Sequence, residues 1–241
     1  MEKIKNFQII LSCLIITLGI IFSSIIFSSK IPKDENITVT GSSSKIVKSD
    51  IAKLGFQIQS RALTQKEAYA ILKKNYPIVE KYLLEKGIKK EEIDVKTVNS
   101  YYNYKTTPNG YTTNEIISYN ASQIIEISSK DVNKIKEIST DIQILADKGI
   151  SLNIFQPEYF YSDLASIKID LLKEASKDAK QRAQSMLEAT NAKVGTVKSM
   201  RMGVFQITPP DSNSVSNMGM NDTTTIDKKV TAVANVVFKI K

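Results

Sequence analysis

The chain of 241 residues has no histidine and no tryptophan, and its only cysteine is Cys13. Without histidine the sequence cannot build a Ser-His-Asp triad, a Cys-His nucleophile pair or the usual zinc sites. A single cysteine excludes a disulfide within the chain. The nine glycines form no Walker loop and no Gly-x-Gly-x-x-Gly motif. No carboxylate pair or Ser-x-x-Lys group stands out, so we expect no catalysis, no cofactor and no metal.

Arginine is also scarce, although the net charge is +8. Only Arg61, Arg182 and Arg201 among the 33 basic residues could make planar, two-pronged contacts with bases or phosphates. The lysines are dispersed among acidic residues, as on a solvated surface, and form no basic stripe. The sequence therefore predicts no nucleic-acid partner, and it leaves any small-molecule ligand unidentified.

One long uncharged run is present at the amino terminus, from Phe7 to Ser29, with two lysines on each side. A helix of that length reaches roughly 34 Å, which exceeds a hydrocarbon core of about 30 Å. We expect residues 1–30 to be a retained transmembrane signal anchor, followed by a tether over residues 31–36 and a domain over residues 37–241. The alternative is a cleaved signal peptide, which the length of the run and Phe27 at the minus-three position disfavour.

The positive-inside rule predicts no orientation for this expected anchor, because two lysines lie on either side of it. We therefore use the short amino-terminal tail to predict its orientation. A short tail favours export of the rest of the chain. We therefore expect a single-pass protein bound to the membrane through its amino-terminal helix. Its carboxy-terminal domain would lie outside the cytoplasm, in a periplasmic or extracellular space.

Residue patterns after the tether predict an α+β fold. Apolar alternation and periodicity predict strands over residues 37–41, 45–60, 93–105, 112–129, 150–161, 196–208 and 226–240, and helices over residues 64–87, 131–147 and 162–190. Thr64 and Glu67 form a capping box, Pro77 predicts a kink or a break, and Asn109-Gly110 predicts a hairpin turn.

This order predicts antiparallel sheets with about three helices packed on one face, preceded by one transmembrane helix. Two βαββ-like halves, over residues 36–129 and 130–241, are an alternative division, but the sequence shows no repeat between them.

Half of the ten tyrosines lie in or beside the predicted hairpin, which makes it a candidate interface. Cross-strand packing is the simpler interpretation, but tyrosine also offers a large contact area with a polar tip. A polar loop over residues 209–225 carries two further methionines. The candidate interface residues are Tyr101, Tyr102, Tyr104, Tyr111, Met218 and Met220.

Four stretches carry a family resemblance, namely ITVTG from Ile37, VKSDIA from Val47, EKGIKKEEIDVKTV from Glu85 and EASKDAKQRAQSM from Glu174. They resemble the SIMPL-domain family of bacterial periplasmic, outer-membrane-associated and oxidative-stress defence proteins. Two further stretches, MRMGVFQITPP and DKKVTAVANVVF, resemble the branch of the family with an amino-terminal membrane anchor.

The resemblance carries over no catalytic residues. It implies an envelope protein that acts by binding or by self-assembly into a homo-oligomer, because at least one family member forms a ring- or channel-like assembly. The alternative is a monomeric extracytoplasmic module that binds a ligand or peptide and is linked to oxidative-stress defence.

Overall fold

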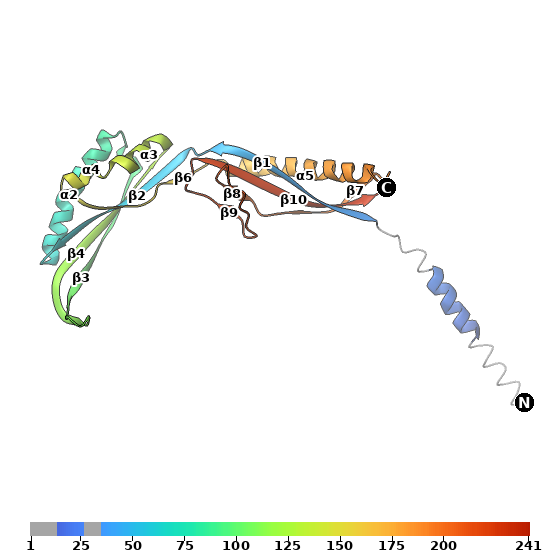
Figure 1. The fold of residues 1–241 in the computed structure, drawn as a ribbon, viewed down its shortest axis with the longest axis horizontal. Coiled ribbons are helices and arrows are strands. Elements are labelled where there is room, and N and C mark those ends of the chain that lie inside the picture. Colours follow the sequence, from blue (N-terminus) through green and yellow to red (C-terminus); the bar gives the residue numbers. More distant parts are fainter. Residues whose placement is uncertain (1–13, 27–34) are drawn as a thin grey trace, which may run out of the picture. The chain divides into compact units, whose positions relative to one another are not determined.

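The structure is a computed structural model that describes residues 14–26 and 35–241 (Figure 1). Its elements are β1 (Asn36–Lys48), β2 (Ile51–Ala62), α2 (Gln65–Glu85), η1 (Lys90–Glu92), β3 (Ile93–Thr106), β4 (Thr112–Ser129), α3 (Val132–Asp141), α4 (Ile144–Asp147), β5 (Ser151–Ile154), β6 (Glu158–Phe160), α5 (Leu164–Glu188), β7 (Val194–Met202), β8 (Gln206–Thr208), β9 (Met220–Asn221) and β10 (Asp227–Ile240).

The described residues group into two compact units. The large unit holds Ser42–Asp178 and Met202–Ala234. The small unit holds Ala179–Arg201, Asn235–Lys241 and the described residues up to Gly41.

A first sheet in the large unit has the strand order β3-β4-β2-β5, and β6 also pairs with β2. The pairing of β2 with β4 is antiparallel and runs from Ala52 opposite Ser129 to Ala62 opposite Tyr119. Alternate residues of β2 are fully buried on one face, at Leu54, Phe56 and Ile58. We call this sheet the helix-covered sheet.

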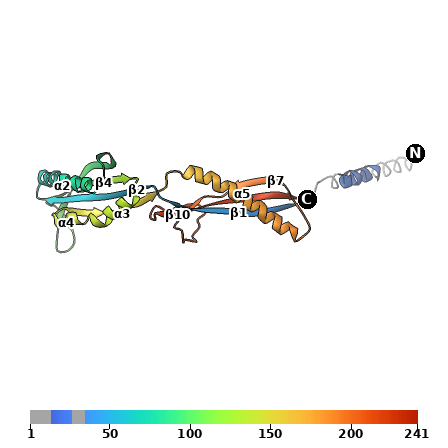
Figure 2. The ribbon, with the colours of Figure 1, turned by 90° about the horizontal axis from the view of Figure 1, so that it is seen from above.

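Helices α2 and α3 cover that buried face and close the main core (Figures 1 and 2). Their apolar residues recur at the helical period and join the same cluster as the inward residues of β2 and β4. Those residues are Ala68, Leu72, Val79 and Leu83 from α2 and Val132, Ile135 and Ile138 from α3. The opposite face of β2 carries Lys53, Gly55, Gln57, Gln59 and Arg61, which are half-buried or exposed.

The second sheet has the strand order β1-β10-β8-β9, and β7 also pairs with β10. Strand β10 is antiparallel to β8, whereas β8 and β9 are parallel. In the large unit, Ile167 and Leu171 of α5 pack with Ile207 and Val230 of this sheet.

The predicted α+β class with antiparallel strands is therefore confirmed, but the helix expected over residues 131–147 is interrupted. Strand β1 also continues through Gly41 to Lys48, where we predicted two separate strands over residues 37–41 and 45–60. Helix α2 runs as one element through Pro77, so the alternative of a broken helix is wrong. The predicted capping box is present, and so is the predicted β3–β4 hairpin, with Gly110 at a φ of +83°.

The prediction of a transmembrane helix is wrong for the described residues, and this corrects the predicted fold. Residues 14–26 are helical, and 13 residues at 1.5 Å each reach about 20 Å, well short of a hydrocarbon core. This stretch also includes Thr17, Ser23 and Ser24. None of the helices in the described part of the chain is long and apolar enough to cross a membrane. The other residues of the expected span, 7–13 and 27–29, and tether residues 31–34 lie outside the described residues.

Candidate functional site

The β3–β4 hairpin extends beyond the strand that supports it. Strand β2 ends at Ala62, which pairs with Tyr119, while β3 and β4 go on pairing with each other from Asn103 opposite Ser118 to Thr106 opposite Thr112. We call residues 103–118 the hairpin arm. Within the described residues, the two strands of the arm pair only with each other, so the arm has two open edges.

Apolar side chains are exposed along this arm. Tyr104, Ile116 and Ile117 are each about two-fifths exposed, and Tyr111 at the turn is 74% exposed. The only charged residues of the arm, Lys105 and Glu115, form an ion pair at 2.8 Å. The arm therefore combines exposed apolar surface with no net charge.

The structure brings together only some of the predicted interface tyrosines. The Tyr102 and Tyr104 rings meet edge to face with centroids 5.1 Å apart, and the Tyr102 and Tyr119 centroids are 6.2 Å apart. Tyr101 points to the other face of the sheet, because it alternates with Tyr102 and pairs with Asn120. Tyr111 lies apart at the turn.

The two predicted interface methionines belong to the second sheet. Met220 lies in β9, and Met218 just before it is 93% exposed. The structure therefore divides the predicted interface residues between two sheets, and their role in self-association stays a prediction.

A cleft of about 770 Å³ opens on the face of the helix-covered sheet that the helices leave free. Five carboxylates line it, whereas Lys53 is the only basic residue among the described residues that line it. The carboxylates are those of Glu91, Glu92, Asp94, Glu126 and Glu158. We call this depression the carboxylate cleft.

The carboxylates differ in how they are held. Lys96 contacts Asp94 at 2.6 Å and Glu126 at 3.0 Å, and the hydrogen bonds that it donates to these two carboxylates raise the pKa of Lys96. Glu92 accepts hydrogen bonds from the Ser129 hydroxyl and the Lys89 amide. Within the described residues, the carboxylates of Glu91 and Glu158 have no ion-pair partner. No group of acidic residues in the described part is arranged to hold a metal ion.

A second depression of about 420 Å³ lies farther along the same face. Amide and hydroxyl side chains line it, together with Tyr101, and Arg61 is its only charged residue. Its other lining residues are Gln57, Gln59, Ser60, Asn120, Ala121, Ser122 and Ser151. We call this depression the amide groove.

Hydrogen bonds order the side chains of the amide groove. The Gln59 side-chain amide donates to the Gln57 side-chain oxygen at 2.8 Å, and the Gln57 side-chain amide donates to the Ser122 hydroxyl at 3.1 Å. Arg61 donates through Nε to the Ser118 hydroxyl at 2.8 Å. The two terminal nitrogens of Arg61 have no partner among the described residues, so they stay available in an oriented guanidinium group.

Sequence reasoning missed this face, although the signal for it was present. The alternation that predicted the buried side of β2 also places Lys53, Gln57, Gln59 and Arg61 together on the other side. The pairing with β4, which the sequence does not specify, adds Ser122 and Glu126 to that side.

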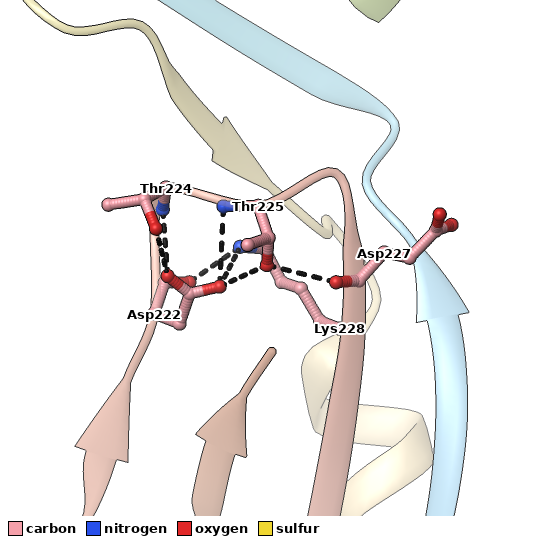
Figure 3. A network of polar contacts seen from close by, with 5 residues as sticks. All are labelled: Asp222, Thr224, Thr225, Asp227 and Lys228. Carbon is pink, nitrogen blue, oxygen red and sulfur yellow. Dashed lines mark hydrogen bonds and ion pairs between the residues drawn. The ribbon is translucent and has the colours of Figure 1, made fainter. Parts of the chain in front are cut away.

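A buried ion pair fixes the end of the polar loop over residues 209–225 (Figure 3). Lys228 lies 3.4 Å from the Asp222 carboxylate and donates to the Asp222 carbonyl at 2.6 Å, and both side chains are less than a tenth exposed. Thr224 and Thr225 donate backbone and hydroxyl hydrogen bonds to the same carboxylate.

Burial and hydrogen bonding oppose each other in this pair. Burial by itself would raise the pKa of Asp222, but the hydrogen bonds from Thr225 and Thr224 and the charge of Lys228 outweigh it and lower the pKa to about 2. Burial lowers the pKa of Lys228, and the Asp222 charge offsets part of that shift. The pair holds the loop in place and lines neither the carboxylate cleft nor the amide groove, so we assign it a structural role.

A family model described as "SIMPL: Protein of unknown function (DUF541)" matches residues 37–238. The match takes in all the strands from β1 to β10 and therefore both sheets. No curated protein matches the chain.

Proposed function

Because the chain belongs to the SIMPL family, whose description assigns no activity, we propose a function from the geometry of the chain itself. We propose that it is a non-catalytic protein that assembles with further copies of itself through the hairpin arm. The observation that carries this proposal is the arm's pair of open strand edges beside exposed apolar side chains.

An arm without a neighbouring strand is thermodynamically unfavourable in water. Two-stranded hairpins are at best marginally stable alone, and open edges offer unpaired backbone groups to any other strand. The arm lacks the usual protection, because its two charges cancel each other and Pro108 lies in the turn. A partner strand would cover both the backbone and the exposed rings.

A second copy of the arm suits this surface. Two arms related by a two-fold axis present the same strands to each other, which is the commonest symmetry of soluble oligomers. Their zero net charge removes electrostatic repulsion between the two arms. Lys105 of one copy can pair with Glu115 of the other copy in place of Glu115 of its own arm. Tyr104 and Ile116, which face each other across the arm, would then be covered.

We further propose that the protein works outside the cytoplasm. The support is compositional: residues 35–241 contain no cysteine, so an oxidising compartment forms no disulfides among them.

The test compares molar masses by light scattering behind size-exclusion chromatography. We expect the wild-type chain to exceed the monomer mass, and the double variant Tyr104→Lys with Ile116→Lys to return to it. The added charges oppose each other across a two-fold contact and remove apolar area. Circular dichroism checks that the fold persists.

The matched control is Ile169→Lys on α5, where an isoleucine is more exposed than either residue of the arm. It should leave the oligomer mass unchanged. A monomeric wild-type chain, or an arm variant that keeps the wild-type mass, contradicts the proposal.

A further inference from the structure

The two depressions on the free face of the helix-covered sheet lie one after the other along β2, and together we call them the track. Lys53 borders the carboxylate cleft and Arg61 borders the amide groove, and both side chains point to this face. The two residues are eight positions apart in the strand, which corresponds to about 26 Å at the rise of a strand. A linear ligand lying along β2 would therefore meet both depressions.

The two ends of this track carry opposite charge. Five carboxylates and one lysine line the first end, so it attracts cations even with Lys96 bound between two of the carboxylates. Among the described residues that line the second end, Arg61 is the only charged one, so that end is positive. The Nε bond of Arg61 to Ser118, whose hydroxyl also accepts a hydrogen bond from Asn103, sets the direction of the guanidinium group. That group is suited to a carboxylate.

The middle of the track offers amides and one apolar contact. Gln57 and Gln59 supply side-chain amides, which donate and accept hydrogen bonds as a peptide group does. Phe155 lies directly over Gly55, where a Cβ atom would come within 2.9 Å of the ring. The glycine thus lets the ring rest on the sheet, and the half-exposed ring can contact an aliphatic side chain.

We propose that this face binds an extended peptide with basic residues over the carboxylate cleft and a carboxylate at Arg61. A polypeptide fits because about 26 Å corresponds to roughly eight extended residues, and a peptide can carry both charges at that separation. A neutral polysaccharide would leave both charged ends without a partner. This inference does not depend on self-assembly, and the arm variant above should keep peptide binding.

The experiment measures fluorescence polarisation of two labelled eight-residue peptides of equal composition. In the first, two lysines and one glutamate lie at opposite ends of a Ser-Ala linker, whereas in the second all three lie together at one end. We expect the first peptide to bind about tenfold more tightly, because only it reaches both ends of the track.

Variants at the two ends then assign the contacts. Arg61→Gln should abolish the preference for the first peptide, and Glu91→Gln with Glu158→Gln should weaken both peptides. Lys66→Gln and Glu85→Gln on α2 are the matched controls and should change neither affinity. Each substitution replaces an exposed charged side chain with neutral, polar glutamine, so folding is preserved.

The inference is overturned by equal binding of the two peptides, by affinities that the end variants leave unchanged, or by no peptide binding at millimolar concentration. Binding of a neutral hexasaccharide in place of either peptide also overturns it. Loss of oligomerisation with peptide binding intact would reject the proposed function alone.

Discussion

Asp222 and Lys228 show how much a single buried charge can matter in this molecule. Both are enclosed where the polar loop returns to the second sheet, and each depends on the other for charge balance. Breaking a buried pair from one side leaves the remaining charge desolvated, and that is usually worse than having no pair.

We predict that Asp222→Asn lowers the free energy of unfolding by about 3 kcal/mol, because Lys228 then stays buried without a counter-charge. Urea denaturation followed by circular dichroism measures the change. Asp211→Asn, in the same loop but exposed, should change stability by less than about 0.5 kcal/mol.

A second substitution separates charge balance from lost hydrogen bonds. Adding Lys228→Met to Asp222→Asn removes the stranded charge, so the double variant should recover part of the lost stability. A double variant less stable than Asp222→Asn would contradict the assignment of the loss to Lys228.

The sequence did not reveal this pair. The stretch over residues 209–225 is rich in Ser, Asn and Thr, and that composition indicates a loop without saying which of its polar groups is buried. The threonines that follow Asp222 are typical of a turn in which a side-chain carboxylate accepts backbone hydrogen bonds. That motif predicts the local turn but not the lysine six residues later.

At the scale of elements, the start of α2 was predictable because its signals are local. Thr64 accepts a hydrogen bond from the Glu67 amide, and Glu67 accepts one from the Thr64 amide, both at 3.2 Å. These contacts satisfy amides that the helix itself leaves unpaired.

We predict that Thr64→Ala destabilises the protein by about 1 kcal/mol, because the cap hydrogen bond is lost. Thermal and urea denaturation measure it. Ser139→Ala in the exposed part of α3 is the control, since the Ser139 hydroxyl only bonds back to the Lys136 carbonyl. Equal losses in the two variants would show that the cap is not the cause.

Strand pairing was less accessible than the strands themselves. Apolar alternation and the Asn-Gly turn located β2, β3 and β4, but these signals did not indicate that β2 lies between β4 and the short β5 and β6. The reason is physical, because pairing between distant segments depends on tertiary packing that no local pattern records. The two depressions depend on that pairing, so they were not predictable, although the alternation in β2 indicates which of its side chains lie on the free face.

At the scale of the whole molecule, the expected membrane span illustrates a different limit. Its prediction rested on the length of an uncharged run dense in Ile, Leu and Phe, whereas the described helix over residues 14–26 is short and includes hydroxyl side chains. The family resemblance was more reliable, because its motifs are spread over the chain and the matched region covers residues 37–238.

We predict that the protein loses stability as the pH falls from about 4 toward 2. The pKa of Asp222 is about 2 in the folded chain, below its ordinary value of 3.8, so the unfolded chain takes up protons first. Hydrogen bonding from Ser162 also lowers the pKa of Asp50, which acts in the same direction.

Urea midpoints measured from pH 6 to pH 2 test this dependence. Asp222→Asn should flatten the curve between pH 4 and pH 2 relative to the wild-type chain, because the titrating carboxyl group is gone. An unchanged slope in that variant would mean that other carboxylates carry the acid sensitivity.

Strand β10 has a consequence for the order in which the chain can fold. It pairs with β1, β7 and β8, and the Thr40 hydroxyl reaches Asn235 across 195 residues of sequence. At a synthesis rate of about 5 to 20 residues per second, β1 waits about 10 to 40 s for this neighbour. Its backbone groups lack their native partner during that interval, so a holdase chaperone has time to capture the nascent chain.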